Sequence, residues 1–210
     1  MLYRSKEERI MKFSAVFIKV AVIVVLVVTV AFTTLIGFPD PATAATLSEE
    51  EAADLTFQRE EEKLARDVYL TLYVKWGAVI FSNIAKSEER HTDTLKKKLD
   101  KYNLPDPALP TIGAFTNPDL QAKYDSLVAD GQLSYVDGLY IGATIEEIDM
   151  IDIQQALDAT THLDLRTAYQ NLLDGSKNHL RAFVAGLAAQ GIIYEPQFIS
   201  KELYDSIIGL

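Results

Sequence analysis

Apolar side chains recur every three or four residues through most of the chain beyond residue 46, which is the period of an amphipathic α-helix. The first such segment begins at Ser48, which forms the pattern of a capping box with Glu51. It runs without glycine or proline to Trp76, and Gly77 is a typical stop. A second helix is expected over about residues 79–101. Strand-like alternation is missing from the sequence, so the pattern predicts an all-α protein.

Helix breakers separate this first pair of helices from the rest. The connection after the second helix contains Pro105, Pro107, Pro110 and Gly113. Asn117 and Pro118 then open a short helix that ends near Gly131, since proline suits the first helical position. Two long helices follow over about 133–159 and 163–190, with a helical turn expected near the C-terminus. Two tight helical hairpins joined by a connection of about thirty residues predict a ferritin-type four-helix bundle.

The N-terminal residues 1–44 have a different character from the rest of the chain. They combine a basic start, a long apolar run and the small-residue ending Ala42-Thr43-Ala44, which is the outline of a secretory signal peptide. The 19-residue stretch Val20–Phe38 is also close to the length that spans a bilayer, so a retained membrane anchor is the alternative. Either interpretation predicts an extracytoplasmic domain over residues 45–210, secreted in the first case and tethered in the second.

Charge and cysteine content narrow the classes of function. The chain has 20 Lys and Arg against 30 Asp and Glu, a net charge of −10. Residues 1–44 contribute 5 against 3 and residues 45–210 contribute 15 against 27, so the predicted domain carries −12. This balance argues against a nucleic-acid partner and favours cations. The chain has no cysteine, which excludes disulfides, a thiol nucleophile and Cys-ligated zinc or iron–sulfur sites.

Polar residues interrupt the apolar stripe of the second helix. One face of this helix carries Ile84, Glu88, His91, Leu95 and Leu99. Glu88 and His91 therefore project into the bundle, three residues apart, where a carboxylate and an imidazole can bind the same or adjacent metal ions. Such a Glu-x-x-His spacing arises by chance in many helices, so this motif alone is a weak signal.

The third and fourth long helices repeat the anomaly. Glu146 falls at the centre of the apolar stripe of the third helix, and Asp149 lies one turn further on. Glu147 and Asp152 point away from this stripe and are expected to be solvated. On the fourth helix, His179 is expected to face inward.

The first helix offers three consecutive glutamates. Helical phase puts Glu61 nearest the middle of the apolar arc, Glu62 at its edge and Glu60 outside it. This arc is formed by Phe57, Leu64, Ala65, Val68 and Leu72. Each long helix thus brings an ionisable group to the core, and burying unpaired charge costs several kcal/mol per ion. A cation would neutralise such a cluster.

The count of charges favours a pair of metal ions. Four carboxylates, one from the first helix together with Glu88, Glu146 and Asp149, balance two divalent ions. His91 and His179 supply one imidazole to each ion. Oxygen-rich ligation with one nitrogen per metal and no sulfur favours two iron ions, with manganese as the alternative.

The candidate ligands lie in four stretches of sequence that resemble a known protein family. The stretches are residues 55–69, Ser87-Glu88-Glu89-Arg90-His91, residues 142–149 and residues 175–183. The chain resembles the rubrerythrin-related, ferritin-like di-iron proteins over about residues 53–205, and it looks closest to an archaeal and bacterial ferritin-like family known as a domain of unknown function.

The resemblance bears on the choice of ligands. In the wider ferritin-like group the first-helix ligand precedes an alanine by three residues and a tyrosine by seven, which fits Glu62, Ala65 and Tyr69. This conflicts with the helical phase that favours Glu61, and both residues remain candidates. Glu146 and Asp149 are similar to a rubrerythrin-like Glu-x-x-Glu. On the fourth helix Ser176 stands where the group usually has a glutamate, so that Asp149 must compensate.

The resulting expectation is an exported di-metal protein that reacts with peroxide, dioxygen or ferrous iron. Tyr69 is expected to donate a hydrogen bond to a ligand carboxylate, with a half-buried aromatic side chain as the alternative. Because no cysteine-rich electron-transfer module exists in this chain, the electrons come from an external donor or from the substrate. Two other functions remain open, namely a metal-sequestering module without turnover and a structural bundle whose acids meet water, Arg66 or Arg181. A homodimer, as related bundles form, is left open.

Overall fold

The computed structural model describes residues 46–209, which form six helices and no strand. In chain order these are α2 (Glu49–Trp76), α3 (Val79–Lys101), α4 (Pro118–Gly131), α5 (Tyr135–Ala159), α6 (Leu163–Ala189) and α7 (Lys201–Ile208). No helix within this part of the chain is both long and apolar enough to cross a membrane. The predicted signal peptide or anchor of residues 1–44 lies outside the described residues.

Local sequence signals explain where the helices begin and end. Ser48 and Glu51 form the expected capping box, with the Ser48 backbone N–H donating to Glu51 at 2.9 Å and the Glu51 N–H donating to Ser48 at 3.1 Å. Gly77 ends α2 with a positive φ of 63°, a conformation that glycine adopts without steric cost. Asn117 caps α4 with Pro118 in its first turn. The helix boundaries expected from the sequence are confirmed to within two residues.

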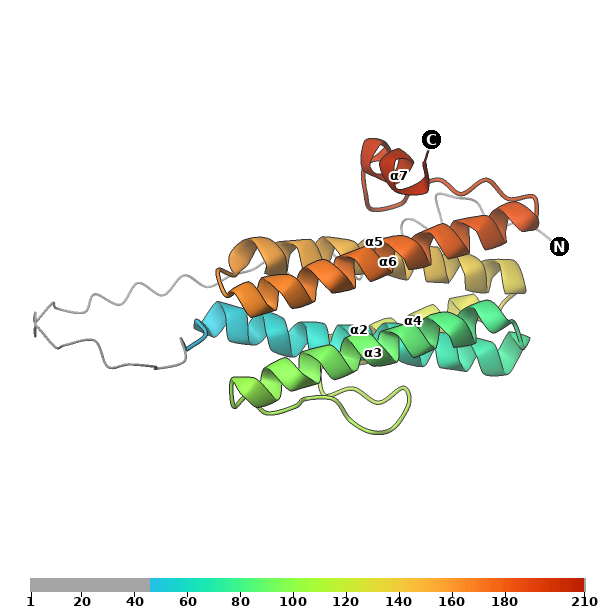
Figure 1. Ribbon diagram of the computed structural model, residues 1–210. Helices are drawn as coiled ribbons and strands as arrows, with labels where there is room; N and C mark the ends of the chain where they lie inside the picture. The colour runs from blue at the N-terminus through green and yellow to red at the C-terminus, as the bar shows by residue number, and fades with distance from the viewer. Residues whose placement is uncertain (1–45, 210) are drawn as a thin grey trace, which may run out of the picture. The chain divides into compact units, whose positions relative to one another are not determined.

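The four long helices pack as two hairpins (Figure 1). α2 and α3 form one hairpin through a two-residue turn, and α5 and α6 form the other. The hairpins pack together with α2 against α5 and α3 against α6. The shorter α4 lies against α2 and α5, so α2 contacts a neighbour on three sides. This four-helix core confirms the predicted helical bundle.

The crossover before α4 covers a face of α2 that the sequence pattern left open. Glu60 was expected outside the apolar arc, but it is only 4% exposed. Both of its carboxylate oxygens accept backbone N–H groups, from Thr116 at 2.6 Å and from Asn117 at 3.1 Å. Glu60 thus lies outside the apolar arc as expected, but it is buried all the same because residues outside the helices cover it.

The C-terminal segment has the same effect on α5. Glu147 was expected to be solvated, yet it is fully buried. It accepts the Tyr194 hydroxyl at 2.7 Å and the backbone N–H groups of Gln197, Phe198 and Ile199. The neighbouring expectation was also wrong, because Asp152 is partly buried under α4 rather than freely solvated.

Candidate metal centre

A cluster of acidic and histidine side chains lies midway along the bundle, with contributions from all four long helices. Its members are Glu62 of α2, Glu88 and His91 of α3, Glu146 and Asp149 of α5, and His179 of α6. The four carboxylates are between 0 and 3% exposed. The structure therefore brings together the residues singled out on three helices and one of the two α2 alternatives.

Each glutamate occupies a core position that its own helix otherwise fills with an apolar or aromatic residue. The seven-residue series are Leu55–Glu62–Tyr69 in α2, Phe81–Glu88–Leu95 in α3 and Leu139–Glu146–Ile153 in α5. Seven residues are close to two helical turns, so the members of each series share one face. Packing of the flanking side chains thus holds the three carboxylates at one depth.

Glu88 lies between the two histidines of the cluster. Its Oε2 is 2.8 Å from Nδ1 of His91, and its Oε1 is 2.7 Å from Nδ1 of His179. The two imidazole rings are 5.6 Å apart between centroids. Both contacts are within ion-pair distance, but neither has the angle of a directed hydrogen bond, so each Glu88 oxygen faces an imidazole nitrogen and no other donor. One carboxylate therefore presents one oxygen to each imidazole nitrogen, as a ligand shared by two metal ions would.

Two groups of three potential ligands share Glu88. One contains Glu62, Glu88 and His91, and the other contains Glu88, Glu146 and His179; in each, one atom per residue lies within 4.8 Å of the others. Glu62 Oε2 is 3.0 Å from Nδ1 of His91, and Glu146 Oε2 is 3.4 Å from Nδ1 of His179. Each group thus offers one imidazole nitrogen and two carboxylates.

Two hydroxyl groups orient carboxylates of the cluster. The Tyr69 hydroxyl donates to Glu146 Oε1 at 2.5 Å, which leaves Glu146 Oε2 directed toward His179. Ser176 donates to Asp149 Oδ2 at 2.7 Å. Both hydroxyl-bearing residues are fully buried. Each bond occupies one oxygen of its carboxylate and leaves the other oxygen without a partner.

Unsatisfied buried atoms concentrate in this cluster. Six of the ten such side-chain atoms among the described residues belong to it, namely Glu62 Oε1, Glu88 Oε1 and Oε2, Glu146 Oε2, Asp149 Oδ1 and His179 Nδ1. A buried acceptor without a partner costs about 1–3 kcal/mol, and more when it is charged. The two arginines considered as neutralising partners bond elsewhere: Arg66 pairs with Asp67 and Glu89, and Arg181 donates to the Ile207 carbonyl and to Asn178.

Burial and mutual repulsion dominate the electrostatics of the carboxylates. Burial raises the pKa of Glu62 to about 8, against the opposing charge of His91. The pKa of Asp149 is raised well above its usual value by burial and then by the charge of Glu62. For Glu88, burial is outweighed by His179 and His91, which lower its pKa to about 2.

For the two histidines, burial and the neighbouring charges have opposite effects on the pKa. Burial alone would lower their pKa values, but the surrounding carboxylates raise the pKa of His91 to about 11 and that of His179 to about 10. Both imidazoles are therefore protonated in the metal-free protein at neutral pH. Two imidazolium charges only partly offset the carboxylates, and a metal ion would have to displace these protons to bind.

Glu61, the other α2 candidate, lies outside the cluster. Its Oε1 is 3.0 Å from Nζ of Lys123 on α4. The helical-phase argument included Phe57 in the core arc, whereas Phe57 is only half-buried and Leu55 is fully buried. The face that carries the cluster therefore follows Leu55, Glu62 and Tyr69, while Glu61 faces α4.

Sequence reasoning missed a glycine that makes room for His91. A Cβ atom on Gly175 would lie 2.6 Å from both Cε1 and Nε2 of the His91 ring, closer than real Cβ contacts allow. A glycine in the middle of a long helix is costly unless packing requires it, and this signal was available in the sequence.

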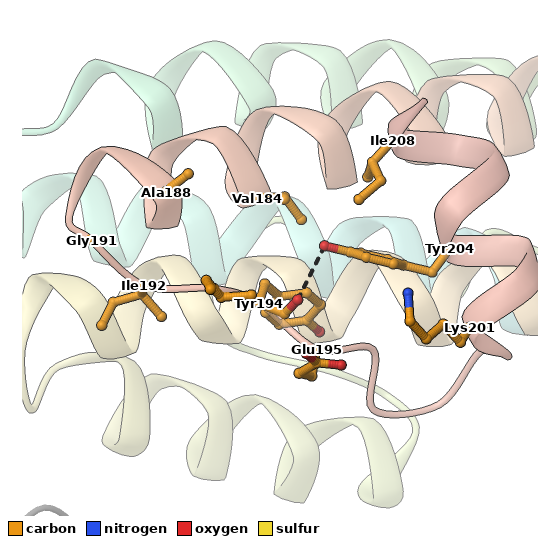
Figure 2. Close-up of a pocket in the computed structure, with 10 residues that line it drawn as sticks. Val184, Ala188, Gly191, Ile192, Tyr194, Glu195, Lys201, Tyr204 and Ile208 are labelled. Atoms are coloured by element: carbon orange, nitrogen blue, oxygen red, sulfur yellow. Dashed lines mark hydrogen bonds between the residues drawn. The ribbon is translucent and has the colours of Figure 1, made fainter. Parts of the chain in front are cut away.

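A separate cavity of about 390 Å³ lies near the C-terminus (Figure 2). It is lined by the end of α6, the following loop and α7, mainly with apolar side chains. Among the residues that line it, the Tyr204 hydroxyl donates to the Tyr194 carbonyl at 3.2 Å. None of the cluster residues lines this cavity.

The fold and the cluster define an all-helical bundle with a buried acid–histidine centre. Residues 51–209 match the family described as "Uncharacterized protein domain (DUF2202)", and the chain belongs to this family. It is 52% identical over 164 residues to the Uncharacterized protein MJ0754 of Methanocaldococcus jannaschii, covering 78% of this chain and 89% of that protein. The crystal structure of hypothetical protein MJ0754 from Methanococcus jannaschii matches with a TM-score of 0.77 and 48% identity, covering 83% of this chain and 98% of that chain.

Proposed function

We propose that this chain is a ferritin-like, rubrerythrin-related protein that holds two metal ions, iron or alternatively manganese, and reacts with peroxide, dioxygen or ferrous iron. The observation that carries the proposal is the position of Glu88. It faces Nδ1 of His91 and Nδ1 of His179 with one oxygen each, and both oxygens are buried with no other polar partner and no directed hydrogen bond.

The donor set fits a pair of divalent ions. Glu62, Glu88 and His91 would hold one ion, and Glu88, Glu146 and His179 would hold the other. Asp149 adds a fourth carboxylate with an unpartnered oxygen, so four negative charges balance two divalent ions. Oxygen donors with one nitrogen per ion and no sulfur suit iron or manganese better than a structural zinc site.

A reduced di-iron pair would supply electrons for cleaving an O–O bond. The chain's own residues position its ligands: Tyr69 fixes Glu146, and Ser176 fixes Asp149. Because Ser176 stands where a fourth-helix carboxylate is usual in the resembling group, one of the two ions would have fewer protein ligands and room for a small oxidant. With no cysteine in the chain, reducing equivalents would come from an external donor.

Two alternatives belong to other classes of function. A sequestering module would bind the same ions without turnover. A purely structural bundle is less well supported, because Arg66 and Arg181 bond to groups outside the cluster and only the two histidines offset part of its negative charge. The predicted export segment remains part of the proposal, as an extracytoplasmic location with or without a membrane tether, and so does a homodimer.

The test is metal loading under nitrogen followed by exposure to peroxide. Metal-free protein is titrated with ferrous iron, and bound metal is measured by elemental analysis. Wild type is expected to bind two ions and Glu88→Ala neither, because both groups share this residue. Glu89→Ala is the matched control, since Glu89 neighbours Glu88 in the chain but is exposed and pairs with Arg66.

The peroxide step separates turnover from sequestration. Rapid peroxide-driven oxidation of the loaded wild type supports the catalytic proposal, whereas two stably bound ions without a reaction indicate the sequestering module. Wild-type protein that binds no metal would contradict both and leave the structural bundle.

A further inference from the structure

A second charged cluster adjoins the metal centre on the side that α4 covers. It consists of Glu61 of α2, Asp152 of α5 and Lys123 of α4. Lys123 Nζ is 3.0 Å from Glu61 Oε1, and Asp152 is within hydrogen-bonding reach of Glu61. We refer to these three residues as the outer cluster and to the metal-centre residues as the inner cluster.

The outer cluster has more acceptors than donors. Glu61 is only 4% exposed, and its Oε2 is buried without a hydrogen-bond partner. Two carboxylates approach each other here, and burial together with the charge of Glu61 raises the pKa of Asp152 to about 8. One ammonium group faces two carboxyl groups, so at least one carboxyl oxygen of the outer cluster has no donor and could accept a cation or a proton.

Chain geometry makes the outer cluster continuous with the inner one. Glu61 directly precedes Glu62 on α2, and Asp152 follows Asp149 by one turn of α5. Both clusters act electrostatically on Asp149, since the charges of Glu62 and Glu61 both raise its pKa. Its Oδ1 is buried without a partner, like Glu61 Oε2.

The outer cluster is also less enclosed than the carboxylates of the inner one. The Lys123 side chain is 13% exposed, and Asp152 is partly exposed, whereas Glu62, Glu88 and Glu146 are at most 1% exposed. A lysine side chain is flexible and strongly hydrated, so its ammonium can move into solvent when another cation takes its place. The row of carboxylates thus runs from partial exposure to full burial.

From this arrangement we infer that Glu61 and Asp152 form a transit site through which a divalent metal ion reaches the inner cluster, with the Lys123 ammonium occupying the site until the ion displaces it. The inference rests on the proposed metal-binding function of the inner cluster. The ligand class is a divalent first-row cation, bound by carboxylate oxygens and passed on through Asp149. Only ligands are exchanged: the two negative charges of Glu61 and Asp152 balance the divalent ion, a proton held by Asp152 is released to water, and the Lys123 ammonium moves into solvent.

The experiment measures how fast metal-free protein takes up Co²⁺, using stopped-flow absorbance, and how much it binds at equilibrium. The test variant is Glu61→Gln with Asp152→Asn, which keeps shape and removes two charges. The matched control is Glu89→Gln with Asp158→Asn, which removes two exposed charges elsewhere on α3 and α5.

We expect the test variant to take up Co²⁺ at least about tenfold more slowly than wild type, since local charge raises association rates by about 10- to 1,000-fold. Its final content should remain two ions per chain, because the inner ligands are intact. The control should load at close to the wild-type rate. Lys123→Met, a single change that removes the competing ammonium, should load faster than wild type.

Two results would overturn the transit site while leaving the proposed function standing. One is a test variant that loads as fast as the control, with Lys123→Met also unchanged. The other is a test variant whose final Co²⁺ content falls, which would make Glu61 or Asp152 part of the resident centre. Wild type that binds no Co²⁺ would instead overturn the proposed metal centre, and the transit site with it.

Discussion

Helix α2 buries charged side chains on two different faces, and the faces differ in how those charges are satisfied. Toward the crossover, Glu60 accepts two backbone N–H groups, and Lys63 pairs with Asp67 while also donating to the carbonyls of Thr111 and Ala114. Toward the bundle interior, Glu62 meets only the Nδ1 of His91, and its second oxygen has no partner.

The contrast shows that burial of a charge does not by itself mark a ligand. Glu60 and Glu62 are two residues apart on one helix and are both buried. The first has its hydrogen-bonding capacity filled by backbone amides, which suits a structural role. The second belongs to a group of carboxylates with more acceptor oxygens than donors around them, which suits a cation.

The largest expected effect concerns the satisfied face. Lys63→Met would remove the ammonium from the fully buried Asp67, which keeps Arg66, and from the carbonyls of Thr111 and Ala114. Breaking a buried ion pair costs about 3–5 kcal/mol, and the remaining Arg66 pair puts the expected loss at about 3 kcal/mol. Thermal or denaturant unfolding should show this loss equally in metal-free and metal-loaded protein. A destabilisation confined to the loaded form would mean that Lys63 supports the metal centre, and the comparison would fail.

Matched changes on the two faces should separate structure from metal binding. Glu62→Gln is expected to weaken metal binding at the His91 position by at least about tenfold. Even the loss of a hydrogen-bond partner of a metal ligand lowers metal affinity by about 10- to 100-fold. Glu60→Gln should lower stability but leave metal affinity unchanged. Titration with Co²⁺ by calorimetry measures both, and equal losses of affinity in the two variants would contradict the distinction.

Gly175 provides a narrower test of the same centre. Gly175→Ala should displace the His91 ring. The affinity for one of the two ions should fall by about tenfold, at the low end of the range for groups that position metal ligands. In a His91→Ala background the same change should have no further effect on affinity, since the ring it displaces is gone. An equal loss in both backgrounds would show that Gly175 matters for helix packing rather than for His91.

The smallest effect is a difference in pH dependence between metal-free and loaded protein. In the metal-free form, burial raises the pKa of Glu62 to about 8, so its contribution to stability is complete below its unfolded value of 4.5 and is lost as pH rises through 8. The pKa values of His91 and His179 are raised to about 11 and 10, so the stability that these two residues contribute is also lost as pH rises above 6.5.

The melting temperature of metal-free protein should therefore fall between about pH 5 and pH 9. Glu88, with a pKa lowered to about 2, loses its contribution only in more acidic solution. Bound metal requires deprotonated ligands, so loaded protein should lose much less stability over this range. Parallel melting curves for chelator-treated and loaded samples would count against a clustered centre.

Local sequence patterns determined most of the helical framework. The capping box at Ser48, the stop at Gly77 and the Asn117–Pro118 start are signals within a few residues, and the structure confirms all three. Heptad spacing also placed Glu88 and Glu146 on inward faces, because a helix repeats its orientation every seven residues whatever surrounds it.

The tertiary structure decided which segment covers each face, and periodicity within one helix carries no such information. Glu60 is buried by residues 116–117, and Glu147 by residues 194–199, far along the chain in both cases. The choice between Glu61 and Glu62 likewise depended on whether α4 or α3 stands opposite, since both faces of α2 are apolar enough to pack. Lys123 reaches Glu61, and His91 reaches Glu62, because helices pack on one another through contacts that no single helix encodes.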